Sequence, residues 1–211
     1  MNKTFFSVIA SLIFVQCAIS QNSIGIKAGL NVSGLQRKFT PDKGVGTEDL
    51  KPLLGYQFGL FYKVSVNSKW SVSSEVNFSL VGAKFPYSID NGFDTSNAEY
   101  RNNGIGYLEV PIIVQYNIHK FYVGIGPGVA FHLFSNGSDS GSYTTNHKTV
   151  DLSANAVAGY KITKKVHLNL RYSYGLMNIV KDDFKNLGGS YNTEVSLKNR
   201  FFNVSLLYSL K

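Results

Sequence analysis

The chain is poor in cysteine and contains no long apolar run. Its 211 residues include a single cysteine, Cys17. Zinc clusters and disulfide frameworks need several cysteines, so both are excluded. No internal run of 18 or more apolar residues occurs, and the mean hydropathy is −0.05. A bundle of membrane-spanning helices is therefore excluded as well.

Charge is also scarce, and acidic residues are scarcer than basic ones. Charged residues make up 16% of the chain, with 21 Lys and Arg against 13 Asp and Glu, which gives a net charge of +8. Aromatic residues make up 14%. A disordered chain shows more charge and fewer aromatics. The length suits one domain or a single β-barrel with long loops.

The first twenty residues have the pattern of a secretory signal peptide. Lys3 supplies a positive start, and an apolar stretch follows at residues 5–15. Ala18 and Ser20 then place small residues at the −3 and −1 positions, which predicts cleavage between Ser20 and Gln21. The alternative is a buried N-terminal helix. The sequence thus predicts a signal peptide at 1–20 and one mature domain at 21–211 that lacks cysteine and carries a charge of +7.

Beyond Gln21 the dominant pattern is alternation of apolar and polar residues, which is typical of β-strands with two unlike faces. In residues 54–66, for example, Leu54, Phe58 and Leu60 fall on one face, and Gln57 and Lys63 fall on the other. Comparable segments begin near residues 24, 54, 70, 108, 121, 152, 166 and 202. The sequence predicts eight strands.

The predicted connections alternate between short and long. Short links occupy residues 67–69, 117–120 and 163–165, and long polar links occupy residues 35–53, 84–104, 135–149 and 177–199. Short turns at one rim, long loops at the other and an even strand number are typical of bacterial outer-membrane barrels. The expected fold is all-β: an eight-stranded antiparallel up-and-down transmembrane β-barrel.

Composition of the two strand faces distinguishes a membrane barrel from a soluble lipocalin-like carrier, which is the alternative. The polar face is rich in glycine and serine and holds seven charged residues: Lys27, Lys63, Glu75, Glu109, Asp151, Lys161 and Arg171. A water-facing sheet carries more charge, about 25–35%, whereas small residues suit a narrow lumen. The apolar face predicts an aromatic girdle near the short turns, at Trp70, Tyr116, Phe121, Tyr160 and Tyr208.

Four segments resemble the small outer-membrane β-barrel family typical of Bacteroidota, often labelled porin-family or PorT-like. They are residues 24–31 (IGIKAGLN), 107–112 (YLEVPI), 124–129 (GIGPGV) and 170–176 (LRYSYGL). The resemblance spans about residues 24–210. It implies an outer-membrane location and a barrel fold, and it implies no shared catalytic residues. A PorT-like member would act as an accessory component of a protein secretion system.

Inward-facing charges are the main candidate site residues. Glu75, Glu109 and Arg171 fall at similar heights above the short turns, and we expect a buried ion-pair network there, extended by Lys63 and Lys27. A charge confined in a lumen must be paired. The alternative is a gated path for protons or ions. No spacing of residues indicates a metal site or a cofactor.

The functional expectation is a non-enzymatic outer-membrane protein that acts in envelope integrity or surface binding. An inward-facing pair, His132 and Asp151, leaves a lipid A-modifying enzyme as a less favoured alternative. Basic residues of the first long link, among them Arg37 and Lys51, would attract lipopolysaccharide. The expected partners are outer-membrane lipid, lipopolysaccharide and envelope or secretion-system proteins. Nucleic acid is not expected, because an exported barrel does not meet it.

Overall fold

The structure is a computed structural model, and it describes residues 22–40, 46–87, 99–136, 149–178, 180–185 and 192–210. The predicted signal peptide and its cleavage site, between Ser20 and Gln21, lie outside the described residues. Within the described part of the chain, no helix is long and apolar enough to cross a membrane.

Antiparallel strands make up almost all of the described chain. Their bounds are β1 Asn22–Thr40, β2 Gly46–Asp49, β3 Lys51–Ser65, β4 Trp70–Tyr87, β5 Glu99–Ile118, β6 Phe121–Asn136, β7 Val150–Lys161, β8 Val166–Gly175, β9 Val180–Lys185 and β10 Asn192–Ser209.

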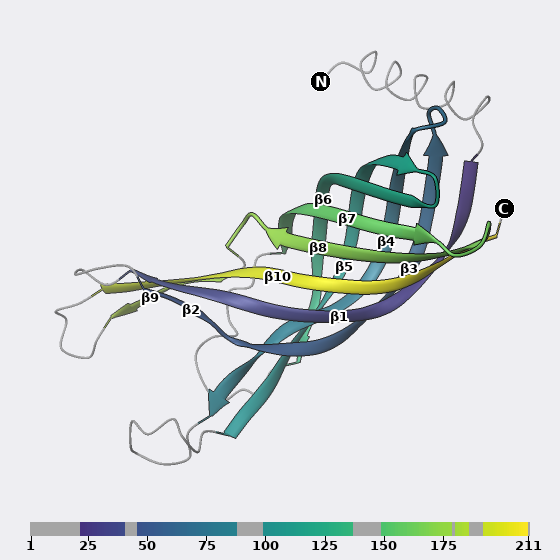
Figure 1. Cartoon of the computed structure of the whole chain (residues 1–211). Helices are drawn as coiled ribbons and strands as arrows, with labels where there is room; N and C mark the ends of the chain where they lie inside the picture. Colours follow the sequence, from purple (N-terminus) through teal and green to yellow (C-terminus); the bar gives the residue numbers. More distant parts are fainter. Residues whose placement is uncertain are drawn as a thin grey trace, which may run out of the picture.

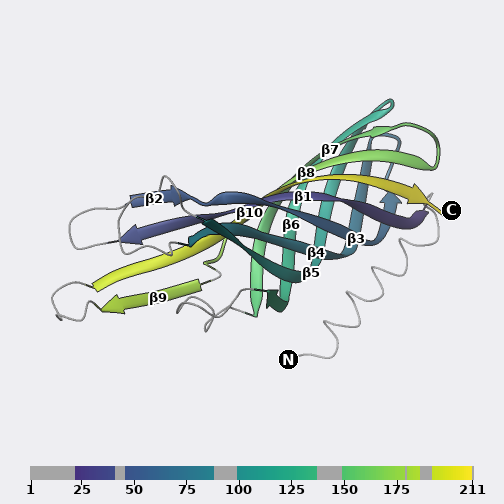
Figure 2. The same cartoon turned by 90° about the horizontal axis from the view of Figure 1, so that it is seen from below.

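Eight of these strands close a barrel. Each strand of the series β1, β3, β4, β5, β6, β7, β8 and β10 pairs with the next, and β10 pairs back onto β1 from Gly25↔Ser209 to Thr40↔Glu194. Figures 1 and 2 show the closed wall and the C-terminus at the end where the short turns lie. The predicted eight-stranded antiparallel barrel is therefore confirmed.

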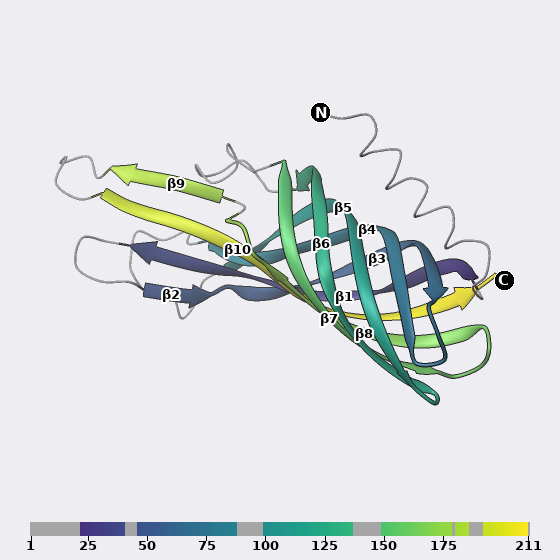
Figure 3. The same cartoon turned by 90° about the horizontal axis from the view of Figure 1, so that it is seen from above.

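The strands at the other end are longer than the sequence predicted. The expected loops 35–53 and 177–199 contain the short strands β2 and β9, which pair with the outer parts of β1 and β10. β2-β1-β10-β9 thus form a four-stranded sheet that projects beyond the barrel, as Figures 1 and 3 show. We call it the projecting sheet. Backbone pairing continues here without apolar alternation, which is why the pattern missed it.

Strand length places the projecting sheet outside the bilayer. β1 has 19 residues, which at about 3.4 Å per residue and a tilt near 45° rise by about 45 Å. The apolar band of an outer-membrane barrel is only about 25 Å tall. The outer halves of β1 and β10 therefore stand clear of the membrane and carry β2 and β9 with them.

The two faces of the wall are inverted relative to a soluble protein. On β3, Leu54 is 66% exposed and Leu60 is 56% exposed, whereas Gln57 is 1% exposed. The same alternation recurs around the barrel, with apolar side chains outside and Asn, Ser and charged side chains inside. The outward surface fits hydrocarbon, and the inward one needs hydrogen-bonding partners.

The short turns are shaped by side-chain caps. Asn67 Oδ1 accepts hydrogen bonds from the backbone N–H groups of Lys69 and Trp70, at 2.9 and 2.8 Å. Thr163 Oγ1 likewise accepts from Lys165 and Val166, at 3.1 and 2.9 Å. These contacts replace the ladder bonds that the chain loses where it reverses direction.

Gly82 occupies a position on β4 that only glycine fits. Its φ is +153°, and an added Cβ would lie 2.0 Å from the Asn103 carbonyl oxygen. The Ser33 hydroxyl fixes this backbone, since it accepts from Gly82 N–H at 2.8 Å and donates to the Gly82 carbonyl at 2.9 Å. Such strained positions cost about 1–3 kcal/mol for other residues.

We therefore expect Gly82→Ala to lower the free energy of unfolding by about 1–3 kcal/mol. The measurement is urea unfolding of the barrel in lipid vesicles. Gly104→Ala is the matched control, because Gly104 pairs with Gly82 across the ladder and its added Cβ would meet Leu80 at an acceptable 3.4 Å. Equal losses in the two variants would contradict this account of Gly82.

Candidate functional site

The middle of the lumen holds a cluster of buried ionic groups centred on Glu75 of β4. Its Oε2 lies 3.0 Å from Lys27 Nζ of β1, and its Oε1 accepts a hydrogen bond from Arg171 Nη2 of β8. Asn77 Nδ2 donates to Oε2 at 2.9 Å. All three charged side chains are at most 3% exposed. One carboxylate thus joins strands from opposite sides of the barrel.

Glu109 of β5 lies in the same region but is held by neutral groups. Its Oε2 accepts hydrogen bonds from Gln57 Nε2 and Ser79 Oγ, each at 2.9 Å. Two basic and two acidic side chains therefore share this part of the lumen. Glu75 is the counterion of both cations, as confined charges require, whereas the Glu109 carboxyl is held by neutral donors.

Lys63 does not belong to this network, and the prediction is corrected on that point. Phe61, not Lys63, stands opposite Glu75 in the β3–β4 register. Lys63 falls one inward position closer to the short turns, where its ammonium lies 4.8 Å from the centre of the Tyr122 ring. It makes a cation–π contact there in place of an ion pair with Glu75.

The lumen below the ionic cluster is filled by Tyr122. Its ring takes the space that a Cβ on Gly159 would need, which would lie 2.0 Å from the ring. Asn169 Nδ2 donates a hydrogen bond to the Tyr122 hydroxyl at 3.0 Å. The tyrosine and the glycine on the neighbouring strand therefore form a filled layer near the short-turn rim.

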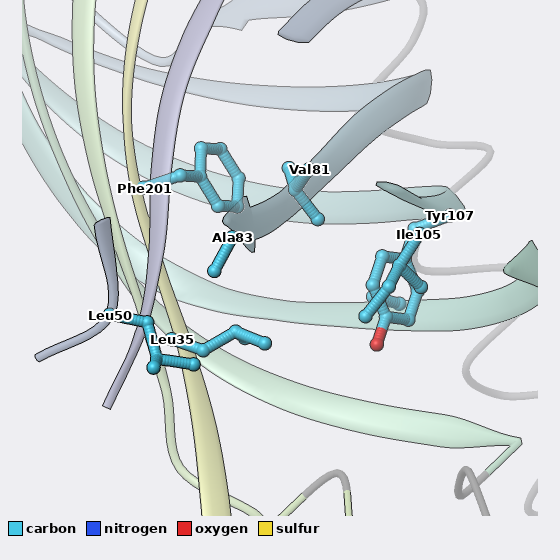
Figure 4. Close-up of a cluster of buried hydrophobic side chains, with 8 residues drawn as sticks. Leu35, Leu50, Val81, Ala83, Ile105, Tyr107 and Phe201 are labelled. Carbon is cyan, nitrogen blue, oxygen red and sulfur yellow. The ribbon is translucent and has the colours of Figure 1, made fainter. Parts of the chain in front are cut away.

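The lumen above the ionic cluster is filled by apolar side chains, which sequence reasoning did not predict. Eight buried residues form the cluster: Leu35, Leu50, Val81, Ala83, Ile105, Tyr107, Ala130 and Phe201. Figure 4 shows Leu35 and Leu50 lying together inside the barrel, with Phe201 and Val81 in the same interior region. We call this the apolar layer. The signal was present in Leu35, Val81 and Ile105, but these fall in or beside segments interpreted as loops.

The predicted aromatic girdle residues lie at the short-turn end, mostly as contacting pairs. The Trp70 and Tyr116 rings pack edge to face with centroids 4.9 Å apart, and the Phe121 and Tyr160 rings are 4.8 Å apart. Tyr208 stands on the same face and is 43% exposed. The positions suit the membrane–water interface, where aromatic side chains gather.

His132 and Asp151 lie on the hairpin partners β6 and β7. Asp151 is 4% exposed and pairs with Ala130, two residues before His132. His132 Nε2 lies 2.8 Å from Ser135 Oγ, and its ring contacts the Tyr107 ring edge to face at 5.9 Å. Among the described residues, no three His, Cys, Asp or Glu gather as a metal site would require. An acid–base role for the pair stays a hypothesis.

Together these features define the class of protein. A closed barrel that is apolar outside, polar inside and ringed by aromatics is a transmembrane β-barrel of the outer membrane. The chain belongs to the outer membrane protein β-barrel domain family, whose family model matches residues 19–181. The expected outer-membrane location is confirmed, whereas the narrower PorT-like assignment stays a prediction. None of the curated protein sequences matches this one significantly.

Solved structures of outer-membrane proteins share this fold. The outer membrane protein OprG from Pseudomonas aeruginosa aligns with a TM-score of 0.50 at 14% identity, over 90% of this chain and 97% of that one. Neisserial surface protein A aligns with a TM-score of 0.46 at 11% identity, over 87% of this chain and 97% of that one. At such identities, the OprG alignment supports the fold alone.

Proposed function

We propose that this protein is a non-enzymatic outer-membrane barrel that acts at the cell surface, in envelope integrity or in surface binding, through its projecting sheet and long links. The observation that carries the proposal is a filled lumen beneath a sheet that stands clear of the membrane. An eight-stranded barrel has room inside for side chains only. The ionic cluster, the Tyr122 layer and the apolar layer occupy that room.

The filled lumen argues against a general diffusion pore. A path for ions would have to cross both the Lys27–Glu75–Arg171 cluster and the apolar layer above it. An apolar constriction excludes water and closes a pore to ions. We therefore expect the purified barrel to produce no steady porin-like conductance steps in a planar lipid bilayer. Sustained open-channel currents from the folded protein would contradict this view of the lumen.

The surface role is tested in cells that lack the protein. One complementing copy carries the whole chain, and a second has residues 88–98 and 137–148 replaced by short turns while the barrel strands remain. We expect both to reach the outer membrane, and only the whole chain to restore exclusion of a dye that an intact outer membrane keeps out. Full restoration by the trimmed copy would overturn the part of the proposal that assigns the surface role to these long links.

Lipopolysaccharide is the proposed surface partner for the basic first link. Lys51 is exposed at the long-link end of β3, where its ammonium lies 3.6 Å from the Tyr100 ring centre. Arg37 and Lys38 precede it on β1, in the projecting sheet. Basic groups there would meet anionic sugar headgroups at the outer surface. Binding of purified lipopolysaccharide that survives removal of these charges would exclude the basic first link as its site.

The alternative is an accessory subunit of a protein secretion system, as the PorT-like resemblance implies. Affinity purification after mild cross-linking in whole cells separates the two functions. A stand-alone surface protein is recovered with lipid and lipopolysaccharide alone. Stoichiometric recovery of other envelope proteins would favour the secretion role.

A further inference from the structure

The short-turn rim carries exposed charge of one sign. Lys69, Lys120, Lys164 and Lys165 are exposed in the three turns. The segments 63–70, 117–121 and 161–166 contain no Asp or Glu. The acidic residues on the neighbouring strand segments, Glu75, Glu109 and Asp151, are buried inside the barrel. We call the four exposed lysines the lysine collar.

Backbone hydrogen bonds hold neighbouring turns of the collar together. Asn117 N–H donates to the Lys69 carbonyl at 2.7 Å, which joins the β3–β4 and β5–β6 turns. Lys161 N–H donates to the Lys120 carbonyl at 2.7 Å, which joins the β5–β6 and β7–β8 turns. The collar lysines therefore extend from a rigid rim, and like charges fixed near one another favour an anion between them.

The aromatic girdle lies on the outer face of the barrel, next to this rim on the side toward the hydrocarbon zone. Trp70 follows Lys69 in the chain, and Phe121 follows Lys120. Their rings pack against Tyr116 and Tyr160, so two aromatic pairs separate the lysines from the hydrocarbon zone. Lysine on the water side and aromatics at the headgroup level is the order expected for a membrane interface.

An apolar groove begins at the Trp70–Tyr116 pair and runs up the outer face of the barrel. Its volume is about 680 Å³, and its lining includes Val114, Val123 and Ala156. A second groove of about 550 Å³ continues it toward Tyr172, with Ala156 in both linings. Volumes of about 300–1,000 Å³ are those of sites that hold small molecules. The groove lies on the face that meets lipid.

We propose that this groove and the adjoining collar lysines form a binding site for an anionic phospholipid. The headgroup phosphate lies against the ammonium groups of Lys69 and Lys120, and an acyl chain lies in the groove above Trp70 and Tyr116. The short turns of such barrels face the periplasm, so the bound lipid belongs to the periplasmic leaflet of the outer membrane. Basic side chains near a membrane surface select anionic over neutral headgroups.

The test is native mass spectrometry of the full mature barrel in detergent micelles that contain equal amounts of phosphatidylglycerol and phosphatidylcholine. We expect the unmodified barrel to retain phosphatidylglycerol in preference. Lys69→Gln combined with Lys120→Gln removes two headgroup contacts, and we expect the affinity for phosphatidylglycerol to fall by about tenfold or more. The double variant Lys84→Gln with Lys198→Gln removes the same charge at the opposite rim and is expected to bind as the unmodified barrel does.

A second variant tests the groove independently of charge. Ala156→Phe places a ring in the shared part of the two grooves, and we expect it to reduce retention of both lipids. Heat-dependent gel mobility confirms that every variant is folded. Equal retention of the two lipids by the unmodified barrel would overturn the proposal. So would full lipid retention by Ala156→Phe, because a folded barrel with its groove filled would still hold the lipid.

Discussion

Glu75→Gln is expected to destabilise the barrel by about 3–5 kcal/mol, the loss found when one partner of a buried ion pair is removed. Glu75 is the carboxylate that Lys27 and Arg171 share. Glutamine keeps the size of the side chain but leaves two buried cations without their common counterion. The free energy of unfolding is measured by denaturant titration in lipid vesicles. Trp70, the single tryptophan, reports unfolding from its place in the girdle.

The matched control is Glu109→Gln, the same substitution on the same face of the barrel. Glu109 accepts from Gln57 and Ser79, and a glutamine carbonyl oxygen can accept from the same donors. We expect this variant to lose about 1 kcal/mol, the net value of an ordinary hydrogen bond. An unfolding midpoint for Glu75→Gln that equals the unmodified value, or that equals Glu109→Gln, would contradict the assignment of Glu75 as the centre of the cluster.

Ile125→Arg tests which face of the wall meets lipid. Ile125 is 71% exposed near the middle of the apolar band on β6. In a soluble barrel an exposed isoleucine changes to arginine at little cost. On a lipid-facing surface, arginine at the bilayer midplane costs about 2–4 kcal/mol. We therefore expect a loss of that size in the free energy of unfolding from vesicles.

Val66→Arg is the control for depth. Val66 is 58% exposed in the β3–β4 turn, at the short-turn rim. Arginine near the interface costs about 0–1 kcal/mol. A large difference between the two variants supports a lipid-facing surface with a graded depth. Similar small losses at both positions would indicate that water contacts this face.

The barrel itself could be predicted because its lipid-facing segments carry a strict alternation. Leu54 to Leu60 on β3 shows why: hydrocarbon on one side and a crowded lumen on the other leave few acceptable residues for each face. The turns were predictable because Asn67 and Thr163 have side chains that cap a reversing backbone. Strand order followed from the turn lengths.

The projecting sheet could not be predicted in the same way. Outside the membrane both faces of a strand can be polar, and the ladder bonds that hold β2 on β1 come from the backbone of any residue. A register shift at Gly106/Tyr107, in the β5–β6 pair outside the projecting sheet, was also not predicted; it leaves Leu133 and Phe134 both facing outward. Alternation does not reveal such shifts.

The candidate site was predicted in part. The inward positions of Lys27, Glu75 and Arg171 follow from alternation, and the structure brings these three side chains together. Lys63 was assigned to the same cluster because alternation gives the face of a residue but only approximately its height across a tilted barrel. The apolar layer was missed because its members come from five strands and the residue before β3, and each supplies only one or two residues.

The measurement that tests the central claim most directly is gel mobility of the protein from the outer-membrane fraction, with and without boiling. A closed barrel stays folded in detergent until it is heated, so the account predicts that the unboiled protein migrates differently from the boiled protein. Identical mobility, with the protein recovered in the soluble periplasmic fraction, would contradict a membrane barrel and would place the apolar face on the inside.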